Sequence, residues 1–129
     1  MILDTNFIVD FLKDQGNAKS KMQQLVDNRI SFKITAPSIF ELWGGLVFLN
    51  KGDKEKIRII SLLKDQIIYS LNNESAEEAG KIFGELKKKG LEISPLDSMI
   101  AGIAKINNQK IITNDEHFNR VGGLGIVNY

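Results

Sequence analysis

Met1-Ile2-Leu3-Asp4-Thr5-Asn6 is the stretch from which the fold of this chain can be worked out. Three apolar residues lead directly into polar ones, which is typical of a short strand buried on both faces of a parallel sheet. From Phe7 onward the apolar residues recur at helical spacing, so the polar residues are predicted to lie on a strand-to-helix turn. In an open α/β sheet such turns lie at the carboxyl ends of the strands, where ligands bind. Asp4 is therefore a candidate site residue, with helix capping as the alternative role.

The composition is that of an ordinary globular protein. The chain has 129 residues, 43% hydrophobic and 26% charged, and a single domain over residues 1–129 is expected. The 17 basic and 16 acidic residues nearly balance, so no overall charge favours nucleic acid or a membrane surface. The absence of cysteine excludes disulfides, thiol catalysis and thiolate metal sites. No apolar run is long enough for a membrane span and no leader pattern is visible, so a cytoplasmic location is expected.

Strands and helices are predicted to alternate along the whole chain. Strands are expected at residues 1–3, 31–35, 66–71, 110–113 and 126–128. Helices are expected from residue 7, and at residues 18–28, 38–50, 54–64, 75–89, 95–107 and 115–120. This alternation predicts an α/β fold with a parallel sheet and helices on both of its faces.

Three further carboxylates, those of Glu41, Asp97 and Asp115, lie near the predicted starts of helices. Each has an ordinary structural explanation. Ser38 with Glu41 and Ser94 with Asp97 match the capping-box pattern. Asp115 is expected in the first turn of a helix, where the helix dipole favours an acid. Taken singly, capping is the better interpretation of Glu41 and Asp97.

Taken together with Asp4, these acids predict a metal site. The turns of a parallel sheet open on one edge, so the four carboxylates can converge there, and unpaired they would raise one another's pKa. No Lys or Arg adjoins any of them in sequence. Mg²⁺ or Mn²⁺ would neutralise the cluster, because such hard cations prefer carboxylate and water oxygens. Asn6, Thr113 and Asn114 add neutral polar groups at the same edge. A site of this kind is suited to phosphoryl chemistry.

Four motifs of this chain resemble those of PIN-domain nucleases. They are Asp4-Thr5-Asn6 after the first strand, Glu41 within Pro-Ser-Ile-Phe-Glu-Leu, Asp97 within Leu-Asp-Ser-Met-Ile-Ala, and Asp115 within Thr-Asn-Asp-Glu-His-Phe. Their order and approximate spacing match the family, and the likeness runs from Met1 to Tyr129. In size the chain is similar to the VapC-type toxins of toxin–antitoxin pairs.

The resemblance implies a three-layer α/β/α sandwich with a central parallel sheet of about five strands. It also implies endoribonuclease activity dependent on Mg²⁺ or Mn²⁺, frequent homodimers and a neutralising antitoxin. The catalytic and metal-holding residues would be Asp4, Glu41, Asp97 and Asp115. Waters and carboxylates around the ion would be oriented by Asn6, Thr113 and Asn114. The chain departs from the family pattern mildly, with Asn114 where an arginine is frequent and with Ser98 and Gly102 after the third acid.

Two other functions remain open at this point. A non-catalytic binding module could use the same scaffold, although binding alone would not require a repulsive acidic cluster. A receiver domain would need an Asp after the third strand and a Lys near the end. Here the third strand runs into Leu71-Asn72-Asn73, and nothing basic follows Arg120. His117 is the only histidine, which excludes a histidine-pair acid–base mechanism, and it is expected to contact the turn at Asp115.

The predicted helix at residues 38–50 carries more large apolar residues than one buried face can hold. A homodimer contact or an antitoxin-binding groove is therefore expected at Trp43, Leu46, Val47 or Phe48. The alternative is that all four lie in a core between two layers.

Overall fold

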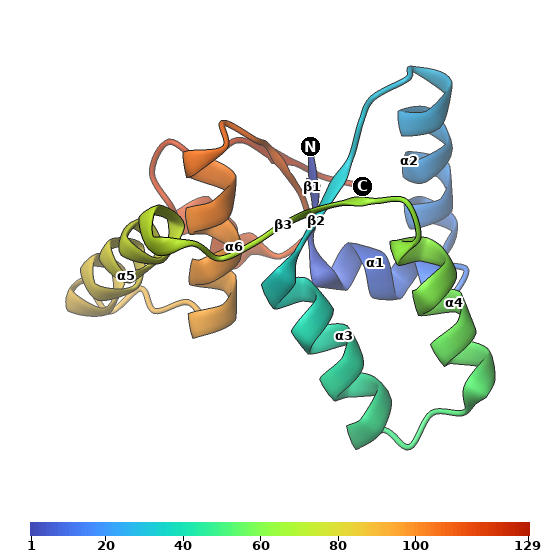
Figure 1. The fold of residues 1–129 in the computed structure, drawn as a ribbon. Coiled ribbons are helices and arrows are strands. Elements are labelled where there is room, and N and C mark those ends of the chain that lie inside the picture. Colours follow the sequence, from blue (N-terminus) through green and yellow to red (C-terminus); the bar gives the residue numbers. More distant parts are fainter.

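The computed structural model describes residues 1–129 and contains one five-stranded parallel sheet (Figure 1). The strands are β1 (Ile2–Leu3), β2 (Lys33–Thr35), β3 (Ile67–Tyr69), β4 (Ile111–Ile112) and β5 (Ile126–Val127). The prediction of a parallel α/β sheet is confirmed. Each strand is shorter than predicted by one to three residues at its ends.

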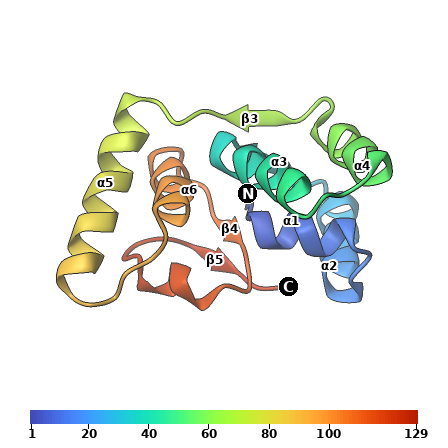
Figure 2. The same ribbon diagram turned by 90° about the horizontal axis from the view of Figure 1, so that it is seen from below.

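Six α-helices and one 3₁₀-helix connect the strands. They are α1 (Thr5–Leu12), α2 (Gly16–Asp27), α3 (Ala36–Phe48), α4 (Asp53–Leu63), α5 (Asn73–Lys88), α6 (Pro95–Ile106) and η1 (Glu116–Arg120). Helices α5 and α6 lie on one side of the sheet, and α1, α2 and α4 lie on the other (Figure 1). Seen from below, β3 runs along one edge of the molecule, between α4 and α5 (Figure 2). The predicted three-layer α/β/α arrangement is therefore confirmed.

Two hydrophobic cores form because alternate strand residues point to opposite faces of the sheet. In β1, Ile2 packs with α5 and α6, whereas Leu3 packs with α1 to α4. In β4, Ile111 and Ile112 divide between the same two cores, and all four side chains are fully buried. The short apolar strands at the centre of the sheet are thus buried on both faces, as their sequences indicate.

The order of the strands, β3-β2-β1-β4-β5, determines where a site can form. The chain adds β2 and β3 on one side of β1 and then returns to place β4 on the other side. The switch point therefore lies between β1 and β4, and ligands of such sheets bind outside the carboxyl ends of the strands at this point. Receiver domains have the order 2-1-3-4-5, so the receiver alternative is wrong.

Helices α5 and α6 pack closely because Gly102 lies at their contact. A Cβ atom at this position would stand 2.7 Å from the backbone nitrogen of Ala79 and 2.7 Å from the backbone oxygen of Ser75. Only glycine allows the two backbones to approach this closely. This packing fixes the position of α6, the helix whose first turn carries Asp97.

Helix α3 buries only part of its apolar surface. Leu42 is buried and Trp43 and Leu46 pack against the core, but Val47 is 76% exposed and Phe48 is 87% exposed. The alternative that all four large residues predicted for an interface lie in a core is therefore wrong. Nowhere in the structure is there a helix with the length and apolar character that crossing a membrane requires.

Candidate active site

Asp4 stands at the switch point, directly after β1. Its carboxylate is almost completely buried, with 1% of the residue exposed. Asp4 Oδ1 accepts a hydrogen bond of 2.7 Å from the backbone N–H of Thr5, so Asp4 is the N-cap of α1. Asp4 Oδ2 accepts a second bond of 2.7 Å from the hydroxyl of Thr113, the residue that follows β4. Capping is thus confirmed, and it occupies only one of the two carboxylate oxygens.

Thr113 links Asp4 to Asp115. While its hydroxyl donates to Asp4, the same oxygen accepts a 3.0 Å bond from the backbone N–H of Asp115. Asp115 is the N-cap of η1, since its Oδ1 accepts from the N–H of His117 at 2.9 Å. The imidazole Nδ1 of His117 lies 3.1 Å from the same oxygen. His117 therefore makes the turn contact expected from the sequence, and one buried hydroxyl fixes two acids.

Glu41 reaches the cluster from α3. The hydroxyl of Thr5 donates a 2.5 Å hydrogen bond to Glu41 Oε2. The predicted capping box of Ser38 with Glu41 is wrong, because α3 begins two residues earlier, at Ala36. Thr35 is the N-cap, and its side chain accepts from the N–H of Ser38. Glu41 therefore lies in the second turn, free of any capping role.

Asp97 lies in the first turn of α6. Ser94 caps this helix, as predicted, and its oxygen accepts from the N–H of Asp97 at 3.0 Å. The hydroxyl of Ser94 donates to Asp97 Oδ2 at 2.7 Å. The serine thus holds both the backbone and the carboxylate of Asp97 and leaves Oδ1 available.

The acids repel one another. The pKa of Asp4 is raised to about 6, mainly by burial and also by the Asp97 and Glu41 carboxylates, while its hydrogen bonds with Thr113 and Thr5 oppose the rise. Burial and the Asp97 charge likewise raise the pKa of Glu41. Burial and the Asp115 charge raise the pKa of Asp97. Asp97 therefore interacts electrostatically with all three other acids.

No lysine or arginine forms an ion pair with any of the four acids, and His117 is the only basic partner. This donor set fits a hard divalent cation, which would neutralise the repulsion. No three acidic or histidine side chains already surround one point as a closed set of ligands. Mg²⁺ usually keeps several waters and is bound through one or two carboxylates, so a closed set of protein ligands is not required for it.

The three neutral residues predicted to support the site have different positions. Thr113 is buried and bonded to Asp4, as described above. Asn6 is exposed in the first turn of α1. The amide of Asn114 donates to the backbone oxygen of Tyr129 at 2.8 Å and accepts from its N–H at 3.0 Å, so it faces the last strand.

Sequence reasoning missed Thr5 and Ser94 as groups that orient carboxylates. Both belong to quoted motifs, and both are hydroxyl residues in the first turn or at the cap of a helix. Ser94 is detectable from the sequence, since a capping serine lies within reach of the acid three residues later. The partner of Thr5, by contrast, is 36 residues away in the chain.

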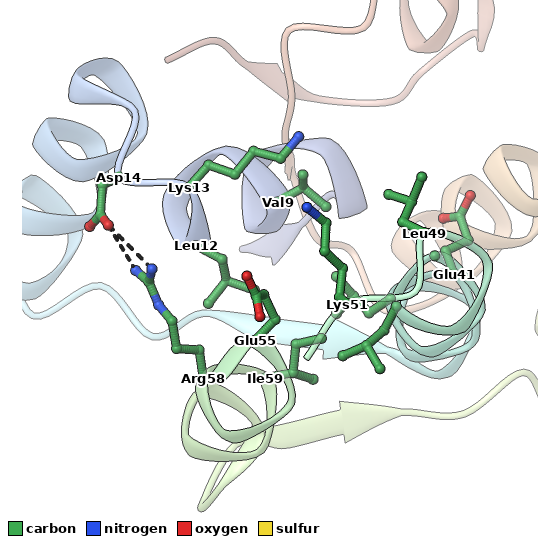
Figure 3. Close-up of a pocket in the computed structure, with 13 residues that line it drawn as sticks. Val9, Leu12, Lys13, Asp14, Glu41, Leu49, Lys51, Glu55, Arg58 and Ile59 are labelled. Atoms are coloured by element: carbon green, nitrogen blue, oxygen red, sulfur yellow. Dashed lines mark hydrogen bonds and ion pairs between the residues drawn. The ribbon is translucent and has the colours of Figure 1, made fainter. Parts of the chain in front are cut away.

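A groove of about 320 Å³ opens beside Glu41, between α1, α3 and α4 (Figure 3). Its apolar lining consists of Val9, Leu12, Leu42, Leu46, Leu49 and Ile59. Lys13 and Lys51 also line it, are exposed, and form no ion pair. Asp14 and Arg58 pair at 3.2 Å at the end opposite Glu41 (Figure 3). Glu55 also lines the groove, so its charged residues are three basic and three acidic (Figure 3). The groove is thus an apolar channel with a mixed charged lining, and Glu41 at one end belongs to the acidic cluster.

Comparison with known proteins places this arrangement in a family. The profile of the PIN domain matches residues 1–124. The chain is 35% identical over 102 residues to ribonuclease VapC3 of Methanocaldococcus jannaschii, covering 79% of this chain and 95% of the relative. It is 27% identical over 124 residues to the tRNA(fMet)-specific endonuclease VapC of Shigella flexneri, covering 95% and 92%.

Solved structures show the same fold. The structure of VapBC2 from Rickettsia felis bound to a promoter DNA fragment contains a chain that superposes with a TM-score of 0.87 at 25% identity. The match covers 99% of this chain and 97% of that one. A chain of the DNA-bound VapBC from Salmonella typhimurium gives a TM-score of 0.82 at 22% identity, covering 98% and 96%. The chain described here belongs to the PIN domain family, as a VapC-type member.

Proposed function

We propose that this protein is a metal-dependent endoribonuclease, the toxin of a toxin–antitoxin pair. The observation that carries the proposal is the convergence of Asp4, Glu41, Asp97 and Asp115 at the sheet's switch point, where none of them has a lysine or arginine partner. The pKa values of Asp4, Glu41 and Asp97 are raised there. A cluster that repels itself is costly to maintain, and a function that requires a divalent cation explains its presence. Ribonuclease relatives in the same family support the reaction class.

The four acids would hold Mg²⁺ or Mn²⁺, directly or through water. The chemistry that a bound ion supplies here is neutralisation of the phosphate charge and a lowered pKa of the attacking water. The chain's own residues supply the geometry. The Thr113 hydroxyl fixes one oxygen of Asp4, Ser94 fixes one oxygen of Asp97, and Thr5 fixes one oxygen of Glu41. Each of these carboxylates therefore keeps a defined orientation before any ion binds.

The test is cleavage of single-stranded RNA with Mn²⁺ or Mg²⁺ by the wild type and by Asp97→Asn. Asparagine still accepts the Ser94 hydrogen bond but removes the charge that interacts with all three other acids. Cleavage should fall by at least about 100-fold, since even residues behind the ligands cost 10–100-fold when replaced. The matched control is Asp53→Asn, which changes an exposed first-turn aspartate of α4. Near wild-type cleavage by Asp97→Asn would contradict the mechanism.

A protein antitoxin would occupy the groove between α1, α3 and α4. The channel is apolar enough for the side chains of a partner segment. Lys13 and Lys51, which form no ion pair, can bind acidic groups on that segment, whereas Glu55 can bind a basic one. The complexes of structural relatives pair a VapC chain with a VapB chain, which supports a partner of this class. Because Glu41 lies at one end of the groove, an occupant would also obstruct the acidic cluster.

Binding of the protein encoded beside this gene tests the groove. Lys13→Glu with Lys51→Glu should raise the Kd by 10-fold or more, because both charges then repel acidic groups on the partner. Lys64→Glu, an exposed change just beyond α4, is the control and should leave the Kd unchanged. An unchanged Kd in the double variant would exclude the groove as the docking surface.

A homodimer would bury the exposed end of α3, where Val47 and Phe48 project. Sedimentation of the wild type should then give a dimer at micromolar concentration, and Val47→Lys should give a monomer. A wild type that sediments as a monomer at high micromolar concentration would remove the dimer from the proposal.

A further inference from the structure

The residues after β5 cross the acidic end of the sheet and are bonded to it at several points. Asn128 donates from its side-chain amide to the backbone oxygen of Thr113 at 3.0 Å. Asn114 forms two hydrogen bonds with the backbone of Tyr129, at 2.8 and 3.0 Å. Asn114, which lies between Thr113 and Asp115, is therefore held by Tyr129, and Thr113 by Asn128. In Figure 2 this end lies beside α1.

The side chain of Tyr129 extends these contacts to α1. Its ring meets the buried ring of Phe7 edge-on, with centroids 4.7 Å apart. Its hydroxyl donates a 2.8 Å hydrogen bond to Asp10 Oδ2, on the turn of α1 that follows Phe7. One residue thus connects the loop that carries Asp115 with the helix that Asp4 caps.

The hydroxyl of Tyr129 adds a hydrogen bond to the packing of its ring. A phenylalanine at position 129 would keep the contact with Phe7, so the hydroxyl and Asp10 serve a different purpose. The hydrogen bond between the two side chains gives Tyr129 a polar connection to α1 that the ring contact alone does not provide. Burial and the Asp10 and Asp4 charges raise the pKa of the Tyr129 hydroxyl, so the phenol stays protonated and continues to donate.

We propose that Asn114, Tyr129 and Asp10 form a clamp that sets the distance between the carboxylates of Asp4 and Asp115, and with it the affinity of the site for a divalent cation. The clamp rests on the proposed function, because it positions the acids that would hold the ion. Asp4 is fixed to α1 at one end, Asp115 follows Asn114 at the other, and Tyr129 bridges them. Tyr129 and Asp10 are positioning residues and touch neither ion nor substrate. The role predicted for Asn114 changes accordingly from orienting waters to holding the clamp.

The test is the Kd for Mn²⁺, measured by titration calorimetry on the whole chain without RNA. Tyr129→Phe removes only the hydroxyl and keeps the contact with Phe7, so it should fold. We expect its Kd to rise about 10-fold, as for other groups that orient metal-holding carboxylates. The matched control is Tyr69→Phe, which changes the other tyrosine of the chain, in β3. Its Kd should equal that of the wild type.

A double-mutant cycle separates the clamp from simple charge effects. Asp10→Asn removes a negative charge as well as the hydrogen bond, so it is measured alone and in the Tyr129→Phe background. If Tyr129 and Asp10 act only through their shared hydrogen bond, the double variant binds Mn²⁺ no more weakly than Tyr129→Phe. If Asp10→Asn changes the Kd for Mn²⁺ by the same factor in the wild type and in Tyr129→Phe, the clamp is overturned and only a charge effect of Asp10 is left.

The remaining outcomes distinguish the clamp from the proposed function. A wild type that binds Mn²⁺, beside a Tyr129→Phe variant with the same Kd, would overturn the clamp alone. A wild type with no Mn²⁺ binding would overturn the proposed function, and the clamp with it. A weakened Kd with unchanged KM for RNA supports positioning of the ion, whereas a general structural defect would also lower the melting temperature without Mn²⁺.

Discussion

The four acids are held in two different ways. Asp4 and Asp115 follow the central strands β1 and β4, and both are bonded to the buried hydroxyl of Thr113. Glu41 and Asp97 stand on helices α3 and α6, are partly exposed, and each has a single hydroxyl partner for its carboxylate. The first pair shares one rigid connection, and the second pair has two separate ones.

This difference indicates a division of roles. The strand-end acids are fixed by the sheet itself, so their positions are set before any ion or substrate arrives. Each helix-borne acid is oriented by one side-chain hydrogen bond to a hydroxyl that is not fully buried, so a change of its rotamer costs less than a displacement of Asp4. A site that must release its product benefits from such a combination of fixed and adjustable groups. The predictions below test the difference between the two pairs.

The pH dependence of stability should be the largest effect. In the folded state the pKa of Asp4 is about 6, whereas the ordinary pKa of an aspartate is 3.8. Between these values the unfolded chain has released a proton that the folded chain keeps. Raising the pH through this window therefore lowers the free energy of unfolding of the metal-free protein, by up to roughly 3 kcal/mol.

Urea unfolding in EDTA between pH 4.5 and 7.5 measures this slope. Mn²⁺ should flatten it by stabilising the ionised carboxylates, and Asp4→Asn should flatten it without metal. A wild type whose metal-free stability does not fall over this range would show that Asp4 ionises normally.

Thr113→Val should cost about 2 kcal/mol of stability, because it leaves a buried carboxylate oxygen and a backbone N–H without partners. The replacement preserves the shape of the side chain, so the loss reports the hydrogen bonds. Cleavage should fall 10–100-fold, since both strand-end acids lose their shared connection. Chemical unfolding and RNA cleavage on the same preparation give the two values. A neutral effect on both would mean that the strand-end pair is no more constrained than the helix-borne pair.

Asp97→Asn should stabilise the metal-free protein by about 0.5–1 kcal/mol, because it removes repulsion among partly exposed charges. The same variant should show a smaller rise in melting temperature with Mn²⁺ than the wild type. Thermal unfolding with EDTA and with millimolar Mn²⁺ checks both statements. A melting temperature indifferent to Mn²⁺ in wild type and variant alike would count against the metal site.

Thr5→Val should have the smallest effect, about 0.5 kcal/mol, because Thr5 and Glu41 are both accessible to water. Glu41 then loses its orientation but remains free to reach an ion, so cleavage should fall less than for Thr113→Val. Measuring the two variants side by side compares the anchoring of the two pairs directly. The division of roles fails if Thr5→Val impairs cleavage as much as Thr113→Val does.

The sequence was sufficient to predict the fold because apolar periodicity changes sharply at residues such as Asp4 and Ser94. The same patterns place all four acids near strand ends or helix starts, and their catalytic and metal-holding roles stay a prediction. The cap of α3 was misplaced because Thr35 and Ser38 both suit an N-cap, and Pro37 favours the earlier start by fitting the first turn. Partners distant in the chain could not be predicted. Tyr129 meets Asp10 across 119 residues, and no local pattern indicates such a contact.

The position of β1 at the centre of the sheet has a consequence for synthesis. Asp4 is made 109 residues before its partner Thr113, an interval of roughly 5–20 seconds at ordinary rates of translation. The groove between α1, α3 and α4 needs only residues 9 to 59. A partner that binds this groove could therefore bind the nascent chain before the acidic cluster has formed. The complete protein would then already be inhibited when it leaves the ribosome.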